Sequence, residues 1–171
     1  RDFLAPFQLI FTLDILVDCA CGCFACALDG CFGSQDAALH QPYTGTEDKG
    51  VLYYDDEKII DFCKEANRAG LQIELHAIGD AAFDQAARAL KAALDDHPRP
   101  DHRHTIIHAC LPTEEGIRIC AEYGIALAIQ SAFIDWPNEP NEYLESTLGD
   151  RAAKLNPFKT YSDHGIVQSL G

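Results

Sequence analysis

Two histidines stand at the ends of predicted strands, where their side chains could bind a metal ion. His76 closes the alternating segment 71–76, and His108 lies at the end of the apolar segment 105–109. Imidazole is a common ligand of zinc and similar ions, and a strand end fixes its direction. A single histidine in such a place is more often a core residue bonded to a loop carbonyl. Two successive strands that present one at the same end favour a shared metal site.

Helical and strand patterns alternate around these two histidines, with short connections between them. The predicted helices cover residues 55–70, 80–97, 112–124 and 156–164, and the predicted strands cover 71–76, 105–109, 125–130 and 166–170. Such alternation is typical of a parallel sheet built from βα units. In α/β barrels the active site lies at the C-terminal ends of the strands, which is where both histidines are expected.

Four further residues are candidates for the same site. Asp80 is expected to cap the helix that follows His76 and to form hydrogen bonds that support the metal ligands. Gln130 ends the next strand at the same rim, where it could contact a substrate. Trp136 lies in a predicted loop rich in Pro and Asn, and either lines a substrate pocket or packs within that loop. Arg103 shapes the site mouth beside His108 or is a solvated loop residue.

Composition excludes several classes of function. The chain has 171 residues, of which 47% are hydrophobic and 23% charged, an ordinary balance for a folded protein. The net charge of −14 argues against nucleic acid and anionic membranes, which attract Lys and Arg. No segment reaches the roughly 20 apolar residues of a membrane span. The apolar segment 7–17 is predicted as a buried strand or helix, and a cytoplasmic location is expected.

Eight cysteines are present, and five of them crowd into 13 residues of sequence (Cys19, Cys21, Cys23, Cys26 and Cys31). They could form a metal or iron–sulfur cluster. Alternation along a strand would place the first three on one face, however, which favours small buried core residues. The spacing does not resemble that of a small secreted scaffold, so reduced thiols are expected.

An ordered set of motifs resembles the amidohydrolase superfamily. The matching segments are 29–34 (DGCFGS), 50–55 (GVLYYD), 76–80 (HAIGD), 98–104 (PRPDHRH) and 107–109 (IHA). The resemblance covers roughly residues 29–171. It is to the branch that includes N-substituted formamide deformylase and the amidohydrolase 3 proteins.

The resemblance implies a TIM-type (β/α)8 barrel that holds one or two divalent metal ions, usually zinc, at its C-terminal rim. It identifies His76 as the fifth-strand ligand and His108 as the sixth-strand ligand. It also implies a His-x-His pair on the first strand, a carboxylated Lys on the fourth and an Asp on the eighth. The only His-x-His spacing here is 102–104, segment 24–28 contains no Lys, and the Asp would follow Gly171.

The function implied by the resemblance is hydrolysis of a non-peptide carbon–nitrogen bond, in an amide or formamide, by metal-activated water. The expected partner is a small amide-like molecule, and a homo-oligomer is left open. A complete barrel needs about 250 residues. The chain is therefore expected to be a single domain, 1–171, that supplies the central and later part of a barrel and is inactive alone. The alternative is a non-catalytic barrel fragment or pseudoenzyme that binds a small ligand or pairs with another chain.

Overall fold

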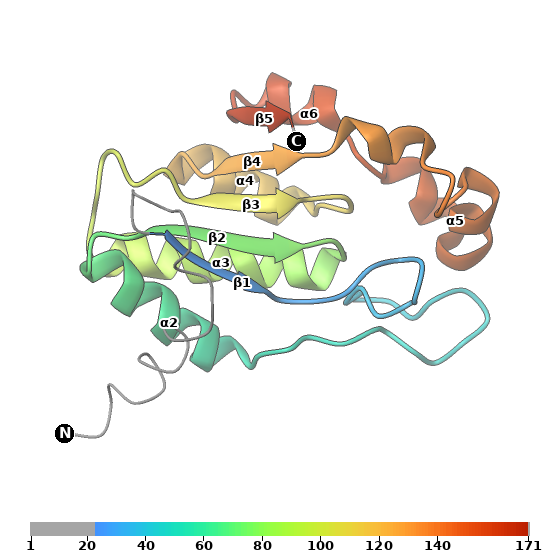
Figure 1. Cartoon of the computed structure of the whole chain (residues 1–171), viewed down its shortest axis with the longest axis horizontal. Coiled ribbons are helices and arrows are strands. Elements are labelled where there is room, and N and C mark those ends of the chain that lie inside the picture. Colours follow the sequence, from blue (N-terminus) through green and yellow to red (C-terminus); the bar gives the residue numbers. More distant parts are fainter. Residues whose placement is uncertain (1–22, 171) are drawn as a thin grey trace.

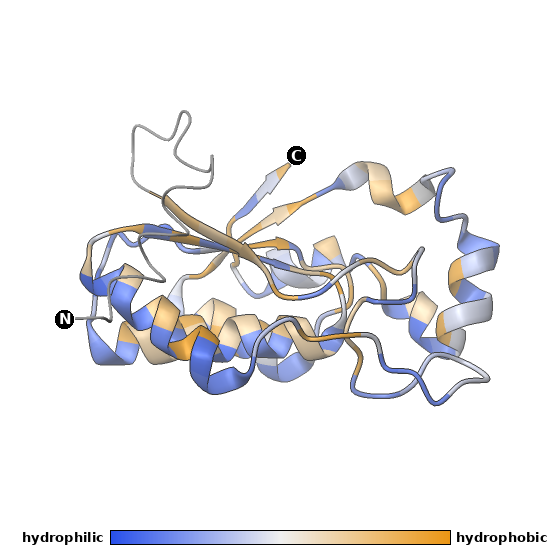
Figure 2. Ribbon diagram, turned by 60° about the horizontal axis from the view of Figure 1, so that its bottom comes forward, coloured by the Kyte–Doolittle hydropathy of each residue, from blue (hydrophilic) through white to orange (hydrophobic). Residues whose placement is uncertain are grey.

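The computed structural model describes residues 23–170, which form a parallel β-sheet with helices packed on one face (Figures 1 and 2). The strands are β1 (Cys23–Ala27), β2 (Gln72–Ala77), β3 (Thr105–His108), β4 (Ala126–Ile129) and β5 (Gln168–Leu170). The α-helices are α2 (Asp56–Arg68), α3 (Asp80–Asp96), α4 (Glu114–Tyr123), α5 (Asn141–Leu148) and α6 (Phe158–Asp163). The expected apolar element at 7–17 lies outside the described residues. Within residues 23–170, no helix has the length and apolar character needed to cross a membrane.

The strands lie in the sheet in the order in which they occur along the chain. Every neighbouring pair is parallel, from β1–β2 through β4–β5. Figure 1 labels α2, α3 and α4, and the turned view in Figure 2 shows helices gathered on one face of the sheet, as right-handed crossovers between successive strands require. A doubly wound sheet would carry helices on both faces, whereas a barrel keeps them on the outside. The α/β class with parallel strands, expected from the sequence, is confirmed as part of a barrel wall.

The alternation of β2 sorts its side chains between the two faces. Ile73 and Leu75 are fully buried and belong to the main core, whereas Glu74 and His76 on the opposite face are half-buried. The buried side chains pack with Ile59 of α2 and with apolar residues of α3 in this core. Burying such aliphatic side chains is the main source of stability. It also directs His76 away from the helices.

Helix ends differ in detail from the sequence expectation. Gly124 ends α4 with a positive φ of 67°, and Thr113 caps its start by accepting a hydrogen bond from Gly116 N–H. Asp80, in contrast, does not cap α3. The cap is Gly79, whose backbone is extended, and Asp80 is the first helical residue. The expected cap role of Asp80 is therefore wrong.

The segment after β4 is more ordered than its Pro- and Asn-rich sequence predicts. The expected loop contains the 3-10 helix η1 (Ser131–Asp135), and α5 then leads into η2 (Gly149–Lys154). Leu144 and Leu148 of α5 pack in a second hydrophobic cluster with Phe32 and Tyr43 of the segment after β1. The contacts that stabilise α5 come from residues about 100 positions away. Figure 1 shows this second layer at the C-terminal end of the strands.

A buried polar network closes the opposite end of the sheet, where His104 precedes β3. His104 is fully buried: its Nδ1 accepts a hydrogen bond from Ile73 N–H at 3.1 Å, and its Nε2 lies 3.1 Å from Oδ1 of Asn67. Both contacts fit a neutral ring with its proton on Nε2. Burial, the largest cause, lowers the pKa of His104 to about 3.

We therefore expect His104 to make the protein acid-sensitive. In the unfolded chain its pKa is about 6.5. Between that pH and about 3, only the unfolded state takes up the proton. The stability that the neutral ring contributes is complete above about pH 6.5. It falls as the pH drops, by up to about 1.4 kcal/mol per pH unit.

Denaturant unfolding followed between pH 7.5 and 4.5 measures this dependence. The variant His104→Gln should lose stability less steeply than the wild-type protein over this range, even though it starts from a lower value. The variant His97→Gln, at an exposed helix end, is the control and should keep the wild-type slope. Equal slopes in all three proteins would show that His104 does not titrate on unfolding.

Candidate metal centre

His76 and His108 converge at the C-terminal rim of the sheet. His76 is the penultimate residue of β2, and His108 is the last residue of β3. Their ring centres are 4.6 Å apart and the ring planes are nearly perpendicular, at 82°. Zinc lies about 2.1 Å from a histidine nitrogen, so two rings that share one ion have centres about 5 Å apart. The observed separation fits a common ion.

The backbone of β3 turns sharply at His108 to produce this meeting. In the β2–β3 register, His76 lies opposite Ile107, whereas His108 lies opposite Ala77. Strict alternation would direct His108 toward the helices, as it does for Ala77. His108 instead has a positive φ of 72°, a conformation that L residues rarely adopt. This turn ends the pleat and is consistent with the contact between the two imidazole rings.

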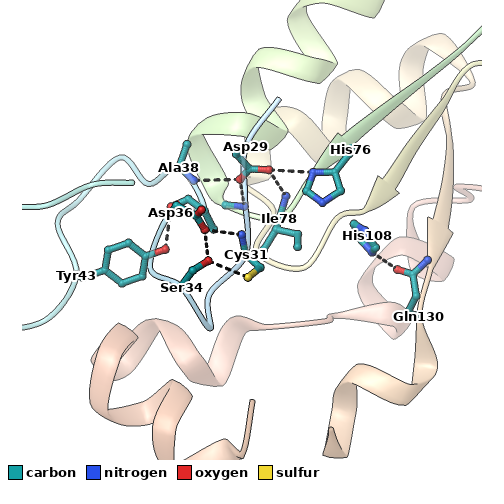
Figure 3. A network of polar contacts seen from close by, with 12 residues as sticks. Asp29, Cys31, Ser34, Asp36, Ala38, Tyr43, His76, Ile78, His108 and Gln130 are labelled. Atoms are coloured by element: carbon teal, nitrogen blue, oxygen red, sulfur yellow. Dashed lines mark hydrogen bonds and ion pairs between the residues drawn. The ribbon is translucent and has the colours of Figure 1, made fainter. Parts of the chain in front are cut away.

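A buried carboxylate lies beside His76 (Figure 3). Asp29 lies two residues after β1, is 1% exposed, and accepts three backbone hydrogen bonds of 2.8–3.0 Å from Ala38, Ile78 and Gly79. Its Oδ1 lies 3.2 Å from Nδ1 of His76. The same Nδ1 atom is buried and makes no directed hydrogen bond with a described residue. The carboxylate of Asp29 therefore lies where it can orient the ring of His76.

Gln130 contacts the other histidine. Its Oε1 lies 2.5 Å from Nδ1 of His108. An amide oxygen only accepts hydrogen bonds, so Nδ1 carries the proton and Nε2 keeps a free lone pair. Burial, the largest cause, lowers the pKa of His108 and favours this neutral ring, although the contact with Gln130 opposes the shift. Gln130 is thus placed to orient His108.

The described residues fit part of a metal site. Two imidazoles can offer nitrogen ligands, but no group of three or more His, Cys, Asp or Glu side chains within residues 23–170 is arranged to hold an ion. The strand β1 (Cys23–Ala27), beside β2, has the sequence CFACA and so presents no lysine. At the rim-facing positions opposite Glu74 and His76, it carries Ala25 and Ala27.

An aromatic stack extends from His108 along the rim. The ring of Phe133 stacks on His108 at 5.4 Å, and Trp136 stacks on Phe133 at 5.0 Å. The structure therefore brings Trp136, which the sequence proposed as a substrate contact, within one ring of the histidine pair. This wall offers a flat apolar surface beside the site.

Arg103 lies at the other end of the sheet. It precedes β3 and forms an ion pair with Asp101 at 2.9 Å. The strand separates Arg103 from His108, so the structure does not bring Arg103 to the site mouth. The pair His102 and His104 occupies the same far end, where His102 contacts the carbonyl of Tyr123 at 3.0 Å. The His-x-His spacing is thus part of the buried polar network.

Two further expectations concern Asp80 and the cysteines. Oδ1 of Asp80 accepts a hydrogen bond from His40 N–H at 2.8 Å and therefore anchors the long segment after β1. The carboxylate beside His76 is Asp29, and its position two residues after a strand was the available signal in the sequence. Cys19 and Cys21 lie outside the described residues. Burial raises the pKa of Cys26 to about 12, which keeps its thiol protonated.

Comparisons with known proteins identify a family and several relatives of this chain. A family model described as "Amidohydrolase family" matches residues 16–171. The Bacillus subtilis protein named "Putative amidohydrolase YtcJ" is 32% identical over 148 residues, which is 84% of this chain and 26% of that protein. The Arabidopsis thaliana protein LONG AFTER FAR-RED 3 is 34% identical over 83 residues, which is 48% of this chain and 14% of that protein.

Two solved structures share the fold of this chain. Both are titled uncharacterized metal-dependent hydrolases. The one from Pyrococcus furiosus has a TM-score of 0.68 and 28% identity, over 86% of this chain and 29% of that chain. The one from Pyrococcus horikoshii has a TM-score of 0.69 and 26% identity, over 86% and 28%. The chain thus spans between a quarter and a third of the length of these relatives.

Gln130 provides a test of the geometry. The substitution Gln130→Leu keeps the approximate volume but removes the acceptor that fixes the proton of His108 on Nδ1. Removal of such a supporting hydrogen bond weakens metal binding by about 10- to 100-fold. We expect this loss in the full-length protein, measured by competition with a chelator of known zinc affinity. Gln41→Leu, at an exposed position, is the control. Unchanged affinity in Gln130→Leu would rule out an orienting role.

Proposed function

Because this chain belongs to the amidohydrolase family, we propose that it forms the central and later part of a metal-dependent hydrolase whose ion is held by His76 and His108. The proposed reaction is hydrolysis of a non-peptide carbon–nitrogen bond in a small amide or formamide. The observation that supports it best is the convergence of the two imidazoles, 4.6 Å apart, at the rim where α/β barrels build active sites.

The surrounding residues support a ligand role for both histidines. Gln130 accepts a hydrogen bond from Nδ1 of His108, which leaves the lone pair of Nε2 for a metal ion. Asp29 lies 3.2 Å from Nδ1 of His76, where its carboxylate can orient the ring and leave Nε2 for the ion. Neither histidine has a basic side chain as a hydrogen-bonding or ion-pair partner among the described residues.

Zinc is the divalent ion that we favour, since imidazole nitrogens suit it and a catalytic zinc site uses three protein ligands. The two histidines would be two of those ligands. Residues 23–170 do not bring a third His, Cys, Asp or Glu side chain together with them to complete the set. When bound, the ion would acidify a water molecule and polarise the carbonyl of the substrate. The described part of the chain orients the ligands and, through the wall of Phe133 and Trp136, shields one side of the site from water.

Substitution of each histidine tests this proposal in the full-length protein. His76→Ala and His108→Ala should each lower bound metal and reduce turnover by at least about 100-fold, because the ion supplies two catalytic contributions together. A purely structural histidine would behave differently. Its loss would cost about 1–3 kcal/mol of stability and would leave turnover per folded molecule intact.

Metal content and turnover, each normalised to folded protein, are the two measurements. His97→Ala is the matched control, because His97 is exposed at the end of α3. If the His76 and His108 variants kept both metal and turnover, the metal proposal would be wrong. A full-length protein that bound no divalent ion would instead favour the non-catalytic alternative, in which the barrel binds a small ligand or a partner chain.

A further inference from the structure

A cavity of about 710 Å³ lies between η1, α5 and η2, next to the C-terminal rim of the sheet. Its apolar lining residues include Phe133, Leu144 and Leu155, and all three belong to or pack against the second hydrophobic cluster. Its polar lining includes the carboxylates of Glu145 and Asp150. The volume lies within the range of about 300–1,000 Å³ that is usual for small-molecule sites.

The cavity is connected to the histidine pair in two places. Phe133 lines it and stacks directly on the ring of His108 at 5.4 Å. Asn156 also lines it, and its backbone N–H donates a 2.7 Å hydrogen bond to the carbonyl of Cys110, two residues after His108. The cavity therefore lies next to the ring of His108, with Phe133 between them.

The charge of the cavity is negative. Glu145 and Asp150 are both exposed, and neither makes a hydrogen bond or ion pair with another side chain within residues 23–170. No Lys or Arg lines the cavity. The neighbouring Arg151 is directed elsewhere, because its Nη1 and Nη2 donate to the carbonyls of Gln41 and Pro42, each at 2.7 Å.

We propose that this cavity receives the side group of the substrate and selects groups that combine an apolar body with a positively charged amine. This inference rests on the proposed function, because it assigns part of the substrate of the same site. The apolar body would pack on Phe133 and Leu144, and the ammonium would lie near Glu145 and Asp150. Both carboxylates remain solvent-exposed, so each contributes modestly and the pair sets a preference of about three- to tenfold.

Two probes of nearly equal size test the preference without turnover. The 2-phenylethylammonium ion and neutral 2-phenylethanol differ in charge but share the aromatic body. Calorimetric titration of the full-length protein, with and without a chelator, should give about three- to tenfold tighter binding of the ammonium in both conditions. Phe133→Leu should weaken both probes, because it removes part of the apolar lining of the cavity.

The double variant Glu145→Gln with Asp150→Asn should abolish the preference and leave 2-phenylethanol binding unchanged. Glu142→Gln is the matched control, because Glu142 is exposed on α5, the helix that carries Glu145, and does not line the cavity. Equal affinities for the two probes, or a preference that survives the double variant, would overturn the proposal. A preference that behaves as expected, in a protein without metal-dependent turnover, would instead overturn the proposed function and leave this binding assignment standing.

Discussion

The buried carboxylate of Asp29 ties together the segments that form the rim. Its two oxygens accept the backbone N–H groups of Ala38, Ile78 and Gly79, which belong to the long segment after β1 and the turn after β2. Because a buried charge is costly unless it is fully bonded, these segments are constrained to meet at Asp29. The same carboxylate lies beside His76. One residue therefore joins the local fold to the electrostatics of the site.

The parallel sheet and the positions of the two histidines near strand ends were predictable from the sequence, because both depend on local patterns. Alternation in β2 and the caps of α4 are short-range features, and they place His76 and the start of the next strand correctly. The pairing of His108 with Gln130 could not be predicted, because it joins positions 22 residues apart through a backbone turn. Arg103 was misleading for a related reason. Arg103 is only five residues from His108 in the sequence, but the full length of β3 separates the two residues in space.

The region after β4 shows where sequence patterns lose information. Helix α5 has eight residues, too few to be stable alone, and no strong cap marks its start. It is fixed by contacts with the segment after β1: Gly33 N–H donates to Glu139 at 2.7 Å, and Arg151 bonds two carbonyls near residue 41. These contacts span more than 100 residues. The position of α5 therefore depends on contacts between two segments that are far apart in the sequence.

The turn at His108 stores strain that its surroundings must balance. His108 and Ala109 both have positive φ values, at 72° and 50°, and such residues cost about 1–3 kcal/mol each. Ala109 N–H bonds to Ala77 at 3.0 Å, and its carbonyl accepts from the hydroxyl of Tyr161 at 2.5 Å. Burial raises the pKa of Tyr161, so its hydroxyl remains a donor. The neighbouring strand and α6 thus hold the turn from two sides. Backbone strain that is opposed in this way is a common means of presenting a side chain to a site, and here that side chain is His108.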